Sequence, residues 1–311
     1  MLSSCPIIDV IVATNRRSPF IDAALATVAA QTWPHWRLIL VDDGGPDPEA
    51  LEAAASHLVE ARVIHRPHAG VSAARNAGLA AGTGQLVAFL DDDDLWDPRR
   101  LEAQVTALRV ASEAVGAFCG GYYIDADGRT FGTGWDAEHV ERERMIDGSV
   151  PAPRIVSLLV TRDTCLRVGG FDESLVLAED NDFVLRVLQQ GPLTAVPEKL
   201  VGYRRHGGNA SDEALTESRR ATDRLLAKQI DAARQRGDAA TAALLRSHRQ
   251  RHHRGAANKS AAVLWLSLRR RDGRAFLDEL SWAIRHAPRF TAAAVVRRTC
   301  RVARRRRHRG R

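Results

Sequence analysis

Short apolar segments alternate with polar, helix-initiating positions through the first third of the chain. Four segments are apolar and rich in β-branched residues, as buried parallel strands tend to be: 9–13, 38–41, 62–64 and 86–90. Helix starts lie between and after these strands at Ser18-Pro19, Asp47-Pro48 and Asp97-Pro98. A further helix is expected to begin at Ala73, with Ser72 as its cap. The βαβαβαβ order predicts an α/β sheet with helices on both faces.

Polar side chains follow three of these strands at the point where each strand ends. Thr14-Asn15-Arg16 follows the first, Asp42-Asp43-Gly44-Gly45 the second, and the run Asp91–Asp94 the fourth. Ligands of such sheets bind at the carboxyl ends of the strands. We therefore expect these groups to converge on one binding site.

The middle of the chain is less regular. Segments 117–123 and 129–131 flank a predicted hairpin turn at Asp125-Ala126-Asp127-Gly128. Leu158–Thr161 is predicted to be a strand, and Asp180–Gln190 has the apolar spacing of a helix.

Charge and composition change after residue 212. Residues 1–212 carry a net charge of −11, whereas residues 213–311 carry +18 and are rich in Ala, Leu and Arg. The pattern predicts an α/β domain over 1–212 and a helical extension over 213–296, with separate helices over 257–269 and 274–287. Residues 297–311 contain nine arginines and no acid, so we expect a disordered or surface-bound tail.

Other features limit the class of protein. No apolar run reaches the roughly 18 residues of a membrane-spanning helix, and the N-terminal segment lacks a basic stretch followed by a long apolar one. The cysteines Cys5, Cys119, Cys165 and Cys300 are scattered, which is typical of reduced thiols in a cytosolic protein. The GxxxxGK[ST] loop of P-loop NTPases is absent. We therefore expect a cytoplasmic protein.

The four consecutive aspartates favour a divalent cation. They directly follow the apolar strand, and two like charges about 4 Å apart repel by roughly 4 kcal/mol at an effective dielectric near 20. Mg²⁺ and Mn²⁺ prefer carboxylate oxygens, and Mg²⁺ often joins carboxylates to substrate phosphates. The alternative is a solvated acidic surface.

As a set, eight short segments resemble the family 2 glycosyltransferases, which have the GT-A (Rossmann-like) fold. In chain order they are Val10–Arg16, Gln31–Trp33, Leu40–Gly44, Gly70–Gly78, Phe89–Trp96, Gly169–Glu173, Glu179–Asp182 and Tyr203–His206. The resemblance covers residues 7–211. It departs from the family pattern at Ala13, where Pro is common, at the position before Asn15, which lacks the usual Tyr, and at Gly45, where Ser is usual.

The resemblance implies a role for each matching residue. Thr14 and Asp42 match positions that contact the nucleotide base, and Arg75 one near the ribose or diphosphate, although a helix-surface arginine is the alternative. Asp91–Asp93 matches the DxD motif, in which Asp91 and Asp92 would contact the nucleotide-sugar and Asp91 and Asp93 would hold Mg²⁺ or Mn²⁺.

The remaining matches are an acidic pair, a late histidine and one extra acid. Asp180 matches the catalytic base, with a helix-capping acid as the alternative. Glu179 is the other member of this acidic pair, and Asp94 is an extra acid that would support the metal ligands without binding the ion. His206 matches a late histidine that can approach the metal or diphosphate, and a loop histidine is equally compatible with it.

The function implied is inverting transfer from a nucleotide-sugar, with UDP-sugar favoured, to a saccharide or lipid-linked acceptor of a cell-surface glycan. Trp135, His139 and the segment 132–153 are expected to shape the acceptor pocket. The basic tail adds an anionic membrane surface as an expected partner at the inner face of the cell membrane. Two alternatives stay open: a nucleotide-sugar-binding protein without catalysis, and a nucleic-acid-binding protein that uses the tail.

Overall fold

The computed structural model describes residues 5–16, 18–206, 215–270 and 273–286. The chain divides into two compact units, residues 1–146 with 150–225, and residues 147–149 with 226–311. The boundary predicted after residue 212 falls within 207–214, outside the described residues.

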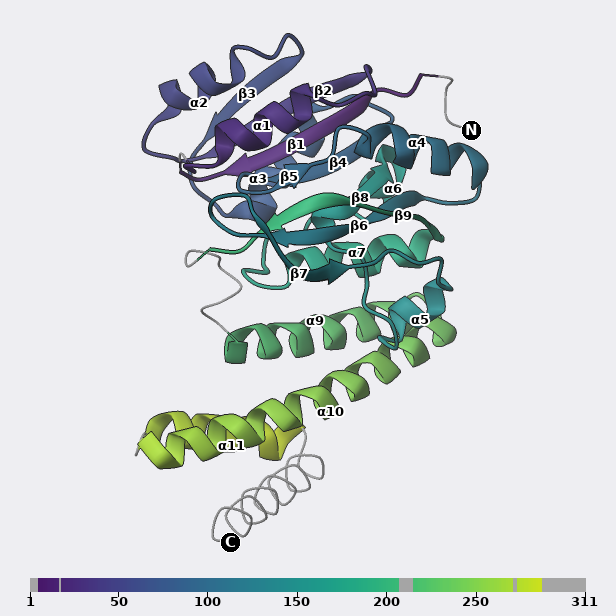
Figure 1. Ribbon diagram of the computed structural model, residues 1–311. Coiled ribbons are helices and arrows are strands. Elements are labelled where there is room, and N and C mark those ends of the chain that lie inside the picture. Colours follow the sequence, from purple (N-terminus) through teal and green to yellow (C-terminus); the bar gives the residue numbers. More distant parts are fainter. Residues whose placement is uncertain (1–4, 17, 207–214, 271–272, 287–311) are drawn as a thin grey trace, which may run out of the picture. The chain divides into compact units, whose positions relative to one another are not determined.

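The first unit is built on one mixed sheet (Figure 1). Its strands within the described residues are β1 (Ile8–Thr14), β2 (Trp36–Asp43), β3 (Ala61–Arg66), β4 (Leu86–Asp91), β5 (Leu95–Trp96), β6 (Gly116–Ile124), β7 (Thr130–Trp135), β8 (Leu158–Thr161) and β9 (Leu193–Arg204). They lie in the order β3-β2-β1-β4-β8-β6-β9-β5, and β7 pairs with β6. The pairs joining β3, β2, β1 and β4 are parallel, as predicted, so that the carboxyl ends of β1, β2 and β4 share one edge.

Helices connect these strands. They are α1 (Ile21–Ala29), α2 (Pro48–Ala55), α3 (Val71–Ala81), α4 (Arg100–Val110), α5 (Arg142–Ile146), the 3₁₀ turn η1 (Ile155–Ser157), α6 (Arg162–Arg167) and α7 (Glu179–Gln190). The predicted cap of α2 is confirmed, because Asp47 accepts a hydrogen bond from the Ala50 amide at 3.0 Å. The predicted hairpin of β6 and β7 and the predicted helix α7 are also present.

The predicted cap at Ser72 is wrong. Helix α3 begins at Val71 after Gly70, whose φ is 98°, a value that favours glycine. The Asp43 carboxylate accepts hydrogen bonds from the amides of Ala69 and Gly70 at 3.1 and 2.7 Å. The carboxylate of Asp43, at the end of β2, thus accepts hydrogen bonds from the backbone N–H groups directly before the helix. Ser72 is buried within the first turn.

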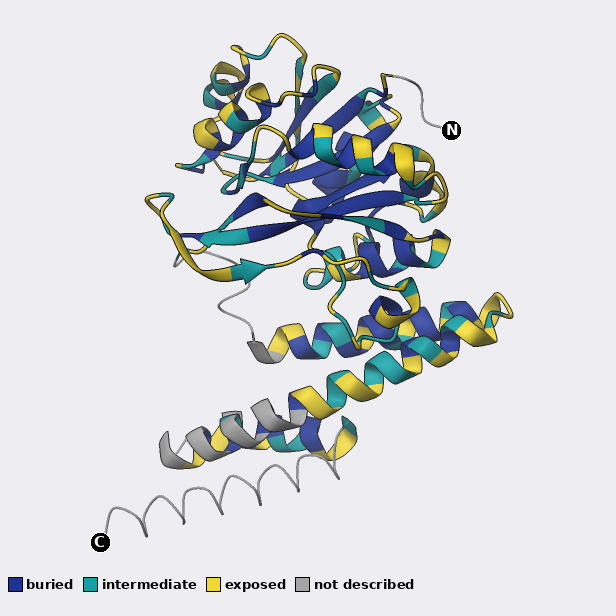
Figure 2. Ribbon diagram, turned by 45° about the vertical axis from the view of Figure 1, so that its right-hand side comes forward, coloured by how far each residue is buried: buried dark blue, intermediate teal, exposed yellow. Residues whose placement is uncertain are grey.

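The core follows the apolar strands. Figure 2 shows β1, β2, β4 and β6 buried along most of their length and β7 mainly exposed, whereas the helices around the sheet have one buried and one exposed face. Two buried polar side chains of α4 reach across to η1: Arg100 Nη2 donates to the Val156 carbonyl at 3.0 Å, and Gln104 Nε2 to the Ser157 carbonyl at 2.8 Å. Because isolated polar groups are costly to bury, these bonds hold the η1 backbone firmly in place.

The C-terminal part is helical, as predicted, with α9 (Leu215–Gln235), α10 (Ala239–Arg270) and α11 (Gly273–His286). The separate helix predicted over 257–269 is wrong, because α10 continues unbroken through it; a single interior glycine, Gly255, costs a helix only about 1 kcal/mol. Among the residues that the structure describes, no helix has both the length and the apolar character to cross a membrane. The Arg-rich tail 297–311 lies outside those residues.

Candidate active site

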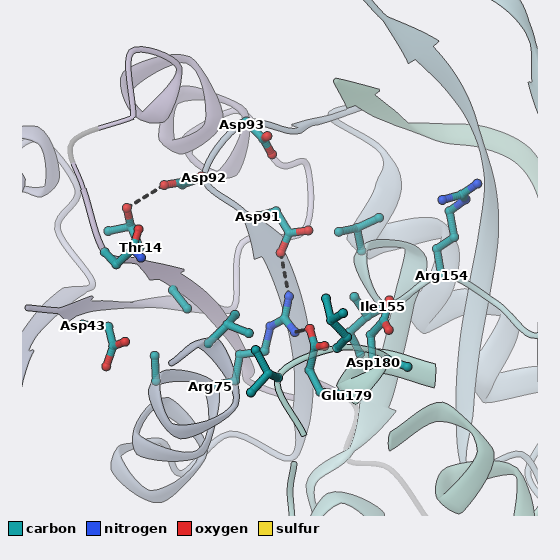
Figure 3. Close-up of a pocket in the computed structure, with 18 of the residues that line it drawn as sticks. Thr14, Asp43, Arg75, Asp91, Asp92, Asp93, Arg154, Ile155, Glu179 and Asp180 are labelled. Carbon is teal, nitrogen blue, oxygen red and sulfur yellow. Dashed lines mark hydrogen bonds and ion pairs between the residues drawn. The ribbon is translucent and has the colours of Figure 1, made fainter. Parts of the chain in front are cut away.

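A cavity of about 470 Å³ opens at the carboxyl ends of β1 and β4. Figure 3 shows Thr14 and Asp43 on one side of it and Glu179, Asp180 and Arg154 on the other, with Asp91 between them. Most of the predicted site residues line this cavity, namely Thr14, Arg75, Asp91, Asp92, Asp93, Glu179 and Asp180. The structure therefore brings together groups that are as much as 166 residues apart in the sequence.

Thr14 and Asp92 meet at the end of β1. Thr14 Oγ1 lies 2.5 Å from Asp92 Oδ2, a hydrogen bond in which the hydroxyl donates. Burial raises the pKa of Asp92 to about 6, despite the opposing effect of this hydrogen bond. The pair joins the DxD segment to the polar end of the first strand.

Arg75 lies between two carboxylates. Its Nη2 donates to Asp91 Oδ1 at 2.9 Å and its Nη1 to Glu179 Oε1 at 3.4 Å (Figure 3). The side chain is only 7% exposed, so it is not a helix-surface arginine. Burial alone would lower the pKa of Arg75, but the charges of Asp91, Glu179 and Asp180 raise it above the usual value. Arg75 is thus a fixed cation in an acidic site.

Glu179 and Asp180 stand in the first turn of α7. Ala178, immediately before them, has φ 66° and is the only non-glycine residue with positive φ in the described chain. Such a left-handed conformation costs roughly 1–2 kcal/mol. Ala178 adopts it directly before α7, and the first two residues of that helix line the cavity. Burial, and secondly the charge of Asp180, raise the pKa of Glu179 to about 7.

A cluster of three phenylalanines fixes α7 relative to β4. The Phe171 and Phe183 rings stack at 4.3 Å, and Phe89 meets them edge-on at 5.1 and 5.7 Å between ring centroids. Phe89 lies on β4 two residues before Asp91, and Phe183 lies on α7 three residues after Asp180. Because packed cores deform little, this cluster sets the spacing between the two groups of acids.

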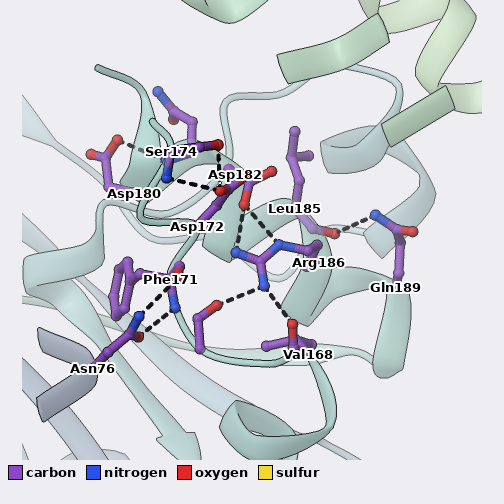
Figure 4. Close-up of polar contacts among 12 residues, drawn as sticks. Asn76, Val168, Phe171, Asp172, Ser174, Asp180, Asp182, Leu185, Arg186 and Gln189 are labelled. Carbon is purple, nitrogen blue, oxygen red and sulfur yellow. Dashed lines mark hydrogen bonds and ion pairs between the residues drawn. The ribbon is translucent and has the colours of Figure 1, made fainter. Parts of the chain in front are cut away.

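Polar contacts hold the turn that carries Phe171 (Figure 4). The Asn76 side chain accepts from the Phe171 amide at 2.7 Å and donates to its carbonyl at 2.9 Å. Arg186 donates to the Val168 and Gly170 carbonyls, each at 2.6 Å, and its Nε donates to Asp182 Oδ2 at 2.7 Å. Both Asn76 and the Gly169–Glu173 segment belong to the matched motifs, and these residues support the site without lining the cavity.

The last two acids of the run differ in their setting, because Asp93 lines the cavity and Asp94 does not. Asp93 Oδ2 lies 3.0 Å from His206 Nε2, and Asp94 Oδ1 accepts from the Arg204 amide at 2.8 Å. Burial, followed by the charge of Asp91, raises the pKa of Asp93, and burial raises that of Asp94 well above its usual value.

Asp42 lies outside the cavity lining. Its carboxylate accepts from the Gly45 amide at 2.7 Å and contacts His65 Nδ1 at 2.8 Å. The neighbouring Asp43 lines the cavity instead. Successive residues of a strand point to opposite faces of the sheet. The sequence pattern does not say which of these two adjacent acids points toward the cavity, so it did not distinguish them.

Asp91 and Asp93 suit a hard divalent cation by donor type. Within the described ranges, no group of three or more His, Cys, Asp and Glu side chains is arranged to hold a metal ion. Mg²⁺ commonly takes one or two carboxylates and completes its shell with water and phosphate oxygens. A cation here would also relieve the repulsion that contributes to the raised pKa of Asp93. The residues therefore fit an ion that binds together with a diphosphate.

The sequence did not single out several other cavity residues, among them Arg154 and Tyr203. Arg154 precedes η1, and Tyr203 lies near the end of β9. Arg154 lies in a segment of irregular sequence that gives no local signal. Tyr203 lay within a matched motif, yet only the position of β9 beside β6 brings it to the site.

Known proteins resemble this chain in sequence. Residues 9–152 match the model of Glycosyl transferase family 2. An uncharacterized glycosyltransferase of Rickettsia felis (strain ATCC VR-1525 / URRWXCal2) is 24% identical over 213 residues, which are 67% of this chain and 35% of that protein. TuaG of Bacillus subtilis (strain 168), a glycosyltransferase provisionally named for teichuronic acid biosynthesis, is 31% identical over 126 residues, 40% of this chain and 50% of TuaG. The chain thus spans about a third to a half of the length of these relatives.

Solved structures share the fold. The crystal structure of S. aureus TarS 1-349 in complex with UDP-GlcNAc superposes with a TM-score of 0.69 at 17% identity, over 93% of this chain and 84% of that one. This likeness confirms the predicted GT-A fold. The matched motifs, the parallel strand ends and the acidic cavity agree with the sequence match, so residues 9–152 of the N-terminal α/β unit resemble glycosyl transferase family 2 in sequence and the chain shares the fold of the TarS structure.

Proposed function

We propose that this chain transfers a sugar from a nucleotide-sugar, with a UDP-sugar favoured, to a hydroxyl of a saccharide or lipid-linked acceptor in cell-surface glycan synthesis. The observation that carries the proposal is that Asp180 lines the same cavity as Arg75 and the DxD acids. The carboxylate of Asp180 is half-buried, and its Oδ1 accepts a hydrogen bond from the Asn181 amide at 2.7 Å.

Asp180 is the general base in this proposal. It takes the proton of the acceptor hydroxyl as the hydroxyl oxygen bonds to the anomeric carbon. The bond from that carbon to the diphosphate breaks, and its electron pair leaves with the nucleoside diphosphate. A single displacement of this kind inverts the anomeric configuration.

Arg75 and the acids of β4 serve the donor. The buried Arg75 guanidinium supplies positive charge that needs no reorganisation during the reaction. Thr14, Asp43 and Asp92 line the side of the cavity that would take the nucleoside. Asp91 and Asp93, with His206 beside Asp93, would hold Mg²⁺ or Mn²⁺, which when bound would offset the charge of the leaving diphosphate.

UDP-GlcNAc bound to the TarS structure supports the choice of UDP. A screen of UDP-, GDP- and dTDP-sugars for metal-dependent release of the nucleoside diphosphate tests the proposal. We expect release from a UDP-sugar. Tight UDP binding without turnover of any donor would favour the non-catalytic binding protein instead.

The basic tail is the basis of a separate proposal about location. Removing residues 297–311 takes away nine positive charges, and each basic residue near an anionic leaflet adds about 1 kcal/mol of attraction. The tail would thus hold the protein at the inner face of the cell membrane. In vitro, we expect the full-length protein to bind anionic vesicles at low salt and the truncated protein to bind them much less. Equal co-sedimentation of the two proteins would discard the tether, and tighter binding to duplex DNA would favour the nucleic-acid alternative.

A further inference from the structure

Three aromatic side chains from neighbouring strands form a cluster beside the cavity. Tyr123 of β6, Trp135 of β7 and Tyr203 of β9 have ring centroids 5.8 to 6.3 Å apart. Gly121 leaves room for the indole, because a Cβ at that position would lie 2.2 Å from the Trp135 ring. The glycine and the three rings therefore form one packed arrangement.

Arg154 extends over all three rings. Its guanidinium carbon lies 5.8, 4.9 and 5.1 Å from the centroids of Tyr123, Trp135 and Tyr203, and Nη2 donates to Tyr123 Oη at 3.1 Å. Stacking on aromatic faces orients the planar guanidinium and leaves its remaining N–H groups available. The backbone of Arg154 adjoins η1, which α4 holds in place through Arg100 and Gln104.

The charge of Arg154 has no carboxylate partner among the described residues. Within the described residues, no carboxylate lies within ion-pair distance of it, whereas the guanidinium of Arg75 contacts two carboxylates and that of Arg204 three backbone carbonyls. A second cation, Arg16, also has no carboxylate within ion-pair distance among the same residues, and it lines the cavity two residues after Thr14. The cavity thus has one such cation near Thr14 and another on the Asp180 side (Figure 3).

We propose that Arg154, supported by its three aromatic neighbours, binds an oxyanion of the acceptor, a carboxylate or a phosphate close to the hydroxyl that receives the sugar. The inference rests on the proposed function, which places the acceptor hydroxyl at Asp180. Arg154 lines the cavity on that side, away from the Thr14 and Asp43 that would take the nucleoside. A planar guanidinium binds carboxylate and phosphate through two parallel hydrogen bonds. The acceptor class is therefore an acidic saccharide or a phosphate-bearing polyol or lipid-linked sugar.

The experiment compares acidic probes with their neutral counterparts in the full-length chain, with UDP and Mg²⁺ present. The pairs are glycerol 1-phosphate with glycerol, and methyl glucuronoside with methyl glucoside, which separate phosphate from carboxylate. The readout is tryptophan fluorescence, and Trp135→Phe identifies the part of the signal that comes from the aromatic cluster. Arg154→Met keeps the length of the side chain without its charge. Arg129→Met is the matched control, because Arg129 is exposed, pairs with Asp127 and does not line the cavity.

We expect saturable binding of at least one acidic probe and at least about tenfold weaker binding in Arg154→Met, with Arg129→Met like the wild type. Equal binding of acidic and neutral probes, unchanged binding in Arg154→Met, or no saturable signal in the wild type would each overturn the proposal. Weaker UDP binding in Arg154→Met would also overturn it by assigning Arg154 to the donor. Donor hydrolysis by the wild type is measured separately, so that failure of the proposed function is seen independently of the anion site.

Discussion

Replacement of Arg75 by methionine tests how the site is held together. Arg75 is 7% exposed and pairs with Asp91 at 2.9 Å and Glu179 at 3.4 Å. Methionine keeps most of the apolar stem but leaves both carboxylates without their cation. Removing one partner of a buried ion pair typically costs about 3–5 kcal/mol. We expect a loss of this size in the free energy of unfolding at about pH 8, in the absence of metal and nucleotide.

The loss should shrink in acid. Burial and the charge of Asp180 raise the pKa of Glu179 to about 7 even with Arg75 in place, and the variant should raise it further. A carboxyl whose folded pKa lies above its unfolded value binds more protons in the folded state, so stability falls as pH rises between the two values. The cost of Arg75→Met is therefore fully present above the folded pKa of Glu179 and diminishes toward its unfolded value near 4.5.

Urea unfolding at about pH 5.5 and about pH 8 measures both effects. Arg37→Met is the control, because Arg37 pairs with Glu60 at 3.5 Å on the surface, where such pairs contribute about 0–1 kcal/mol. A loss below about 1 kcal/mol at the higher pH, or an equal loss at both pH values, would refute this view of Arg75.

Three further predictions follow from other parts of the site. Chelation of the metal by EDTA should abolish donor turnover, and added Mn²⁺ or Mg²⁺ should restore it. The variant Asp93→Asn should bind UDP with an affinity that does not depend on added metal. Metal-stimulated UDP binding in that variant would exclude Asp93 as a metal ligand. Glu179→Gln should reduce the fall in metal-free stability between about pH 5.5 and about pH 8 by roughly 1–3 kcal/mol, seen in parallel thermal melts, and an unchanged pH profile would contradict the raised pKa. Gly121→Ala should cost about 1–3 kcal/mol by displacing the Trp135 ring, and a neutral effect in urea unfolding would show that the ring moves freely.

The sheet was predictable because its signals are local. Four apolar strands, and polar ends on three of them, were visible in the first third of the chain, and the structure confirms the strands with limits that differ by a few residues at most. The strand β9 was missed. Its sequence contains Pro197, Glu198 and Lys199 and lacks a clear period, and its pairing with β6 is shifted in register around Cys119 to Gly121. Tertiary pairing outweighs local propensity in such a strand.

The site was predictable only in part. The acids at strand ends could be recognised one segment at a time, but the contact of Arg75 with both Asp91 and Glu179 depends on α3, β4 and α7 packing together. Asp42 and Asp43 illustrate the limit, since one of two adjacent acids faces the cavity and the other contacts His65. Arg154 carried no signal in the sequence, because its setting comes from three strands that are distant along the chain.

The most direct test of the proposed glycosyl transfer is the Asp180→Asn variant. Asparagine keeps the shape of the side chain but cannot accept the proton, so the account predicts that transfer from the UDP-sugar identified by the donor screen falls about 10²–10⁴-fold. UDP affinity should stay near that of the wild type, and Asp163→Asn, an exposed acid of α6 paired with Arg167, should leave both unchanged. Near-normal transfer by a folded Asp180→Asn protein would contradict the account.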